Sequence, residues 1–82
     1  LEVRQVRVRD LNWFLGAEEA GCVQVRYNGS PVPCTVEEAE DGEWVAHLDE
    51  PVIGVAPGQS AVFYTEDGQR VVGGGVVARR DA

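Results

Sequence analysis

The sequence predicts an all-β protein, a small six-stranded antiparallel β-barrel, and three observations support this prediction. Apolar and polar residues alternate with a period of two in nearly every apolar stretch, which is the pattern of half-buried strands. Valine supplies 15 of the 82 residues, and β-branched side chains suit a pleated, half-buried surface. Turn-forming residues recur between the alternating stretches, at 28–31, 41–42, 56–58 and 67–68.

The first strand is predicted around Val6 and Val8, which share one face, whereas Arg7 and Arg9 share the other. We therefore expect this strand to line the core with valine and to present arginine to solvent. Residues 1–12 as a whole are interpreted as the end of an interdomain linker together with this strand.

The apolar stretch at residues 11–15 is expected to close one end of the barrel or to pack against preceding chain through Trp13. A single helical turn is predicted at residues 18–20, because Gly16 and Gly21 bracket it closely. A six-stranded sheet in so short a chain conceals its edges most simply by closing. The other alternating stretches predict five further strands, at residues 22–27, 32–36, 44–48, 61–64 and 71–77.

The net charge of −7 traces to one segment. Residues 37–50 hold seven acids and no base, whereas residues 1–9 hold three arginines against one glutamate. A free-standing nucleic-acid-binding domain needs a basic footprint, so any nucleic-acid contact is expected to be local and weak alone. The length permits one domain over residues 1–82, and no apolar run is long enough for a membrane helix. The lack of methionine indicates a piece of a larger protein.

Four groups could carry chemistry but are interpreted as structural. Gly73 to Gly75 lack the helix that follows a phosphate loop, and instead predict a bulge or corner where another backbone comes close. Cys22 and Cys34 are expected to be buried free thiols, because zinc-type spacing and signs of secretion are absent. His47 has no partner nucleophile at a recognisable spacing, and the carboxylates of the acidic segment are expected to be solvated. We assign no catalytic residue, metal site or disulfide.

Several motifs together resemble one protein family. They are Val-Arg-Asp-Leu-Asn-Trp at 8–13, Val-Arg-Tyr at 25–27, Val-Pro-Cys-Thr-Val at 32–36, Asp-Glu-Pro at 49–51, Val-Ala-Pro-Gly-Gln-Ser-Ala-Val-Phe-Tyr at 55–64 and Val-Gly-Gly-Gly-Val at 72–76. The last two are the most specific. On these motifs the chain is similar, over nearly its whole length, to the C-terminal barrel of bacterial tRNA-specific 2-thiouridylases.

The resemblance implies a translation-factor-like barrel that follows an N-terminal ATP-pyrophosphatase domain and a central domain. The family adenylates the wobble uridine of tRNA, using ATP with magnesium, and replaces its oxygen with sulfur from a persulfide cysteine that a sulfur-carrier protein supplies. The nucleotide loop and the catalytic cysteine pair are missing here, so no catalytic role passes to Cys34 and no cofactor is expected in this domain. Partners implied by the resemblance are tRNA and the other two domains, in the cytoplasm and away from membranes.

Arginines are the candidate contacts with tRNA phosphates, although from composition alone ordinary solvation is the simpler interpretation. We expect Arg7, Arg9 and Arg26 to carry any such contact, and Arg79 and Arg80 to a lesser degree, because they cluster away from the acidic segment. The family is typically more basic around Arg26, so binding there is expected to be weaker in this chain. Two other functions stay open, the barrel of a translation-factor GTPase and an acidic protein–protein adaptor.

Overall fold

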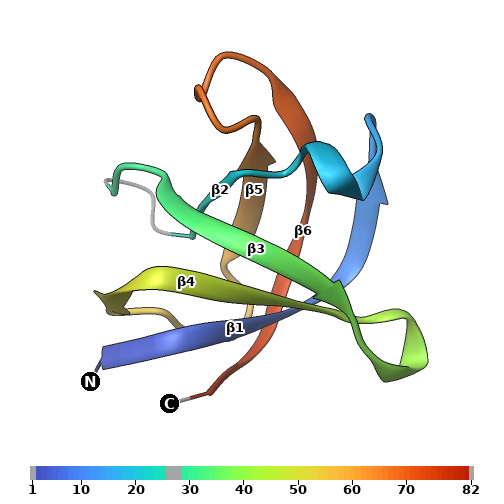
Figure 1. Cartoon of the computed structure of the whole chain (residues 1–82). Coiled ribbons are helices and arrows are strands. Elements are labelled where there is room, and N and C mark those ends of the chain that lie inside the picture. Colours follow the sequence, from blue (N-terminus) through green and yellow to red (C-terminus); the bar gives the residue numbers. More distant parts are fainter. Residues whose placement is uncertain (1, 26–28, 82) are drawn as a thin grey trace.

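In the computed structural model, which describes residues 2–25 and 29–81 and the side chains up to residue 78, six strands close into a barrel (Figure 1). Neighbouring strands are antiparallel throughout, in the order β1-β4-β3-β2-β5-β6 around the barrel. The predicted fold is therefore confirmed. The strands are β1 (Glu2–Trp13), β2 (Cys22–Gln24), β3 (Val32–Glu38), β4 (Trp44–Ile53), β5 (Ser60–Tyr64) and β6 (Val71–Asp81).

β1 and β6 are longer than the alternating stretches that predicted them. β1 already begins at Glu2, so the residues interpreted in part as linker belong to the barrel from that point on. It continues through Trp13, whose ring lies edge-on to Trp44, with centroids 5.2 Å apart, and tilted against the buried Phe63. Trp13 thus packs against the core from within a strand, not from an apolar segment outside the sheet.

The barrel interior is filled mainly with valine. Val6 and Val8 are fully buried, whereas Arg7 and Arg9 lie on the outer face of β1, as the alternation predicted. A register shift between Val3 and Gln5 places Val3 in the core as well. The largest side chains with almost no exposed surface are Phe63, Val6, Val8, Val23, Val72 and Val77.

The glycine triplet lies where β6 passes closely over β1, which confirms the predicted bulge or corner. A Cβ atom on Gly73 would stand 2.6 Å from Cε3 of Trp13, and one on Gly75 would stand 2.7 Å from the carbonyl oxygen of Arg9. The β1–β6 register shifts between Arg9 and Asn12 at this point. The triplet therefore lets two backbones approach each other, which larger residues would prevent.

The turn predictions are confirmed where the structure describes them. Asp41 and Gly42 both adopt left-handed backbone angles (φ 61° and 76°) in the turn between β3 and β4. In the β5–β6 turn Gly68 has φ 74°, and the carboxylate of Asp67 accepts hydrogen bonds from Thr65 Oγ1 and from the Gln69 amide. The Asn28 turn lies outside the described residues.

The helical content of the described residues is two short 3₁₀ turns, η1 (Ala17–Glu19) and η2 (Glu40–Gly42). The first is the predicted single turn, displaced by one residue. Across the part of the chain that the structure describes, no helix has the length and apolar character needed to cross a membrane.

Candidate nucleic-acid interface

Four of the five arginines predicted to contact phosphate come together on two neighbouring strands. Arg7 and Arg9 lie on β1, and Arg79 and Arg80 lie on β6. In the β1–β6 ladder Arg7 is opposite Arg79, and Val6 is opposite Arg80. The backbone thus gathers these arginines at one seam of the barrel. Arg26 lies outside the described residues.

The structure ties Arg7 to the acidic segment, so the prediction that it lies away from those acids is wrong. Its Nη1 donates a hydrogen bond to Oε1 of Glu43 over 3.5 Å, and both side chains are partly buried, with 21% and 29% of their surface exposed. The cause is strand pairing, because β1 runs beside β4 and places Arg7 opposite Val45, two residues after Glu43. Counting charged residues along the sequence does not reveal which of them become neighbours across a sheet.

Arg7 also lies beside an open hollow of about 840 Å³ that is rich in acids. A phosphate that approached this guanidinium would meet several carboxylates, and like charges at this range repel. Arg7 is therefore a poor phosphate ligand in this arrangement. The carboxylates that line the hollow belong to Glu37, Glu38, Glu40, Asp41 and Glu43.

Arg9 is held only loosely. Its Nη1 donates to the carboxylate of the next residue, Asp10, over 2.5 Å, and the two side chains are 49% and 70% exposed. Exposed ion pairs of this kind contribute little stability, so an incoming phosphate can replace the Asp10 carboxylate at small cost. Arg9 thus remains available for an anion.

Arg4 is a further candidate that the sequence predictions did not include. Its side chain is exposed on β1, and it forms no ion pair with any residue that the structure describes. The sequence did contain a signal for it, because Arg4 belongs to the basic start of the chain. In the structure it lies between the buried Val3 and the half-buried Gln5. Arg4 and Arg9 are consequently the two β1 arginines best placed to meet a phosphate.

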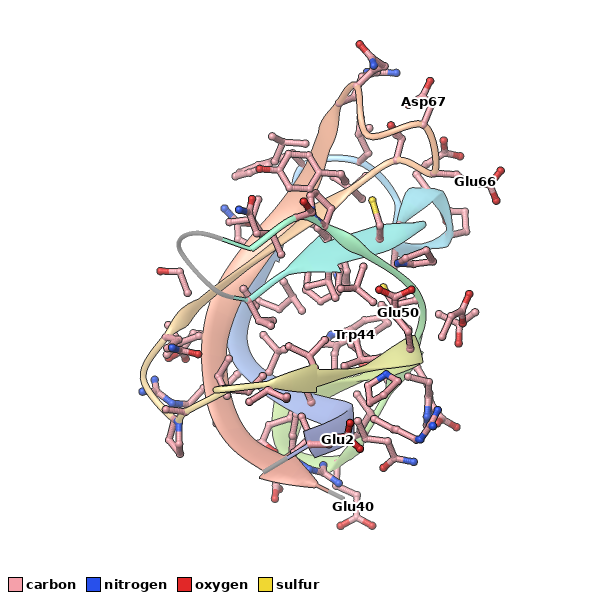
Figure 2. The ribbon with its side chains drawn as sticks, turned by 90° about the vertical axis from the view of Figure 1, so that its left-hand side faces the viewer. Glu2, Glu40, Trp44, Glu50, Glu66 and Asp67 are labelled. Carbon is pink, nitrogen blue, oxygen red and sulfur yellow. The ribbon has the colours of Figure 1, made fainter. Side chains whose placement is uncertain are left out.

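A second acidic patch lies at the opposite end of the barrel. Glu18 and Glu19 of η1 line an open depression together with Glu66 and Asp67 of the β5–β6 turn, where Arg70 is the one base among the lining residues. Figure 2 shows the carboxylates of Glu66 and Asp67 far from that of Glu40. Two separate parts of the barrel surface are therefore acidic, and the hollow beside the β3–β4 turn reaches β1 at Arg7.

His47 has the structural character that the sequence predicted. Its Nε2 lies 2.7 Å from Oε1 of Glu37 on the neighbouring strand β3, and the imidazole is 38% exposed. The carboxylates of Glu38, Glu40 and Asp41 are solvated, again as predicted. Within residues 2–25 and 29–81 no three His, Cys, Asp or Glu side chains are grouped so as to hold a metal ion.

Both cysteines are buried free thiols, as expected. Burial raises the pKa of Cys34 to about 12, with smaller contributions from Cys22 and Asp49. Burial also raises the pKa of Cys22, and its Sγ donates to the carbonyl oxygen of Thr65. Because the thiolate is the reactive form, neither side chain is suited to act as a nucleophile at neutral pH.

Comparison with known proteins gives a consistent result. The family described as the aminomethyltransferase beta-barrel domain matches residues 3–77. The bifunctional protein NifU/MnmA of Rubrobacter xylanophilus is 67% identical over the whole chain, which corresponds to 17% of that protein. The tRNA-specific 2-thiouridylases MnmA of Chloroflexus aggregans and Campylobacter jejuni are 50% and 37% identical over 88% and 94% of the chain, and 21% and 22% of their own lengths. The chain thus spans about a fifth of these relatives, at their C-terminal part.

Proposed function

The chain belongs to the aminomethyltransferase beta-barrel domain family, and from this membership we propose that it is the noncatalytic C-terminal barrel of an enzyme that 2-thiolates the wobble uridine of tRNA. The observation that carries the proposal is the high identity, over nearly the whole chain, to proteins named tRNA-specific 2-thiouridylase. These relatives favour this function over a GTPase barrel or an acidic adaptor.

Within that enzyme the barrel assists in holding the tRNA. The β1–β6 seam supports this role, because Arg9 is exposed there and Arg79 and Arg80 lie on the adjoining strand. Arg4 is exposed on β1 one residue before this ladder begins. The two acidic patches would repel the phosphate backbone, so docking is expected at Arg4 and Arg9 and away from the hollow beside Arg7. The barrel supplies a small part of the total affinity, consistent with its negative net charge.

The rest of the reaction belongs to parts of the enzyme outside this chain. ATP with magnesium is bound by an N-terminal domain, and sulfur arrives from a sulfur-carrier protein. The barrel contacts the N-terminal and central domains and helps to fix their arrangement, and the enzyme works in the cytoplasm.

The proposal is tested with the full-length enzyme, by measuring tRNA thiolation and the salt dependence of tRNA affinity. Each of the changes Arg4→Ala and Arg9→Ala is expected to weaken binding and to reduce the slope of log K against log salt by roughly 0.7–0.9, the value for one phosphate contact. Arg70→Ala is the matched control, because it removes an exposed arginine from the distant acidic end.

The outcomes separate the parts of the proposal. Unchanged affinity and slope in both β1 variants would remove the tRNA contact and leave the barrel a role in domain arrangement alone. A full-length protein that consumes GTP and does not thiolate tRNA would overturn the enzyme assignment.

A further inference from the structure

A groove opens where β3 and β4 separate. Their ladder ends at the pair Cys34 and Leu48, and beyond it β4 continues along β1 through Val52 and Ile53. The start of β3 pairs instead with β2. The two strands therefore diverge and leave a groove of about 310 Å³. Among the described residues that line it, Glu50, Ser30 and Gly29 are accompanied by six apolar ones, Val25, Pro31, Val32, Pro51, Val52 and Ile53.

The groove leaves apolar side chains exposed to solvent. Ile53 is 56% exposed, whereas the adjoining Val52 packs against the core. Pro31 and Pro51 add apolar surface on the two sides of the groove. A single exposed isoleucine would need no explanation, but an exposed isoleucine that lines a groove together with other apolar side chains marks an interaction site.

The groove is built to receive side chains and not an added strand. Addition of a strand to a sheet edge requires free backbone N–H groups as well as carbonyl groups. Proline has no N–H, and Pro31 lines one side of the groove and Pro51 the other. The contact that fits is burial of one or two apolar side chains.

The pairing of β1 with β4 shows that the start of β1 lies next to Ile53. Glu2, the first residue of β1, is opposite Ile53, and Val3 is opposite Val52. Figure 1 shows the start of β1 beside the end of β4, at the side of the barrel where β6 also ends. The relatives are about five times longer than this chain, and their matching part is C-terminal, so in such an enzyme the polypeptide that leads into β1 emerges next to Ile53.

We propose that the groove around Ile53 binds an apolar side chain of the segment immediately preceding β1 in the full-length enzyme, and so fixes the orientation of the barrel on the preceding domain. The inference rests on the proposed function, because it requires the barrel to follow other domains in one chain. The segment starts on the far side of β4 from the groove, one strand away, and a tether this short gives it a high effective concentration at the groove, so even a small apolar contact is occupied.

The first test measures the protection of position 53 in the full-length enzyme. The Ile53→Cys variant is treated with N-ethylmaleimide in native buffer and in denaturant, and modification of the peptide that contains position 53 is followed by mass spectrometry. We expect native labelling at least about tenfold slower than labelling in denaturant, since a covered thiol is inaccessible. Native labelling within about twofold of the denatured rate overturns the proposal.

The second test identifies the occupant. The photoreactive residue p-benzoylphenylalanine is placed at position 53 of the full-length enzyme, and the cross-linked peptide is sequenced. A cross-link to the residues that precede β1 supports the proposal, whereas a cross-link to a second copy of the chain, or to any other region, overturns it. Thiolation of tRNA by the unmodified enzyme is assayed in parallel. An active enzyme with an uncovered position 53 refutes the docking alone, and an inactive one refutes the proposed function.

Discussion

Gly75 of β6 lies directly against the backbone of Arg9 in β1, so closely that a Cβ atom at position 75 would stand 2.7 Å from the Arg9 carbonyl oxygen. The same atom would stand 2.8 Å from a methyl group of Val8, which is fully buried. Displacing a backbone oxygen or a buried methyl group costs free energy, because the surrounding core is closely packed. The close approach of β6 to β1 therefore depends on the absence of a side chain at Gly75.

Gly75→Ala is accordingly expected to lower the free energy of unfolding by about 1–3 kcal/mol, the usual cost of overpacking. Gly74→Ala is the matched control, because its Cβ would meet nothing nearer than the Ala61 carbonyl oxygen at 3.4 Å. Urea unfolding of both variants, followed by tryptophan fluorescence, gives the comparison. Equal stability of the two variants would show that the strand crossing tolerates a side chain.

The strands themselves could be predicted from the sequence, because the information is local. Alternation along residues 6–9 is enough to show that Val6 and Val8 face inward while Arg7 and Arg9 face outward, and the structure agrees. The turns at residues 41–42 and 67–68 were readable for the same reason, since their residue types favour left-handed backbone angles.

Strand ends and charge neighbours could not be predicted, because they depend on pairing between distant segments. β1 extends to Trp13 because β6 runs beside it as far as Gly73, and no local pattern encodes that partner. The contact between Arg7 and Glu43 joins residues 36 positions apart and exists only because β1 pairs with β4. The structure places four of the predicted arginines on β1 and β6, and it pairs Arg7 with an acid that the charge count along the sequence did not assign to it.

Trp13 is expected to contribute strongly to stability. Its partly buried ring contacts Trp44 edge-on and the buried Phe63 at a centroid distance of 5.2 Å, so truncation removes both contacts. Trp13→Ala is expected to cost about 3 kcal/mol. Phe14→Ala is the control, since the neighbouring Phe14 is 65% exposed, and it should change stability by less than about 1 kcal/mol. Circular dichroism is the measurement, and a similar loss in the two variants would contradict the packing role of Trp13.

The two thiols should resist alkylation in the folded protein. The pKa of Cys34 is raised to about 12 by burial, so very little thiolate is present at pH 8. In the Cys22→Ala variant, where Cys34 is the remaining cysteine, iodoacetamide should react at least about 100-fold more slowly in native buffer than in denaturant. Rapid native labelling would show that the barrel opens or that Cys34 is accessible.

The same raised pKa makes stability depend on pH in the alkaline range. The folded state keeps the Cys34 thiol protonated up to about pH 12, whereas an unfolded thiol loses its proton near its ordinary pKa of 9.0. The unfolded state therefore binds fewer protons above pH 9, and stability falls as pH rises from there. In the Cys34→Ala variant this fall should be smaller, as measured by urea unfolding at pH 8, 9 and 10. An identical pH dependence in the variant would assign the effect to other groups.

The ion pair between Arg7 and Glu43 should limit the contribution of Arg7 to tRNA binding in the full-length enzyme. Glu43→Gln removes the acceptor charge and one repulsive carboxylate beside Arg7, so tRNA affinity is expected to rise by about two- to fivefold, a change of about 0.4–1 kcal/mol, comparable to one partly exposed ion pair. In the Arg7→Ala background the same change should give a smaller gain, since no guanidinium is released. Filter binding at two salt concentrations measures all four combinations, and an equal gain in both backgrounds would leave repulsion as the only role of Glu43 in tRNA binding.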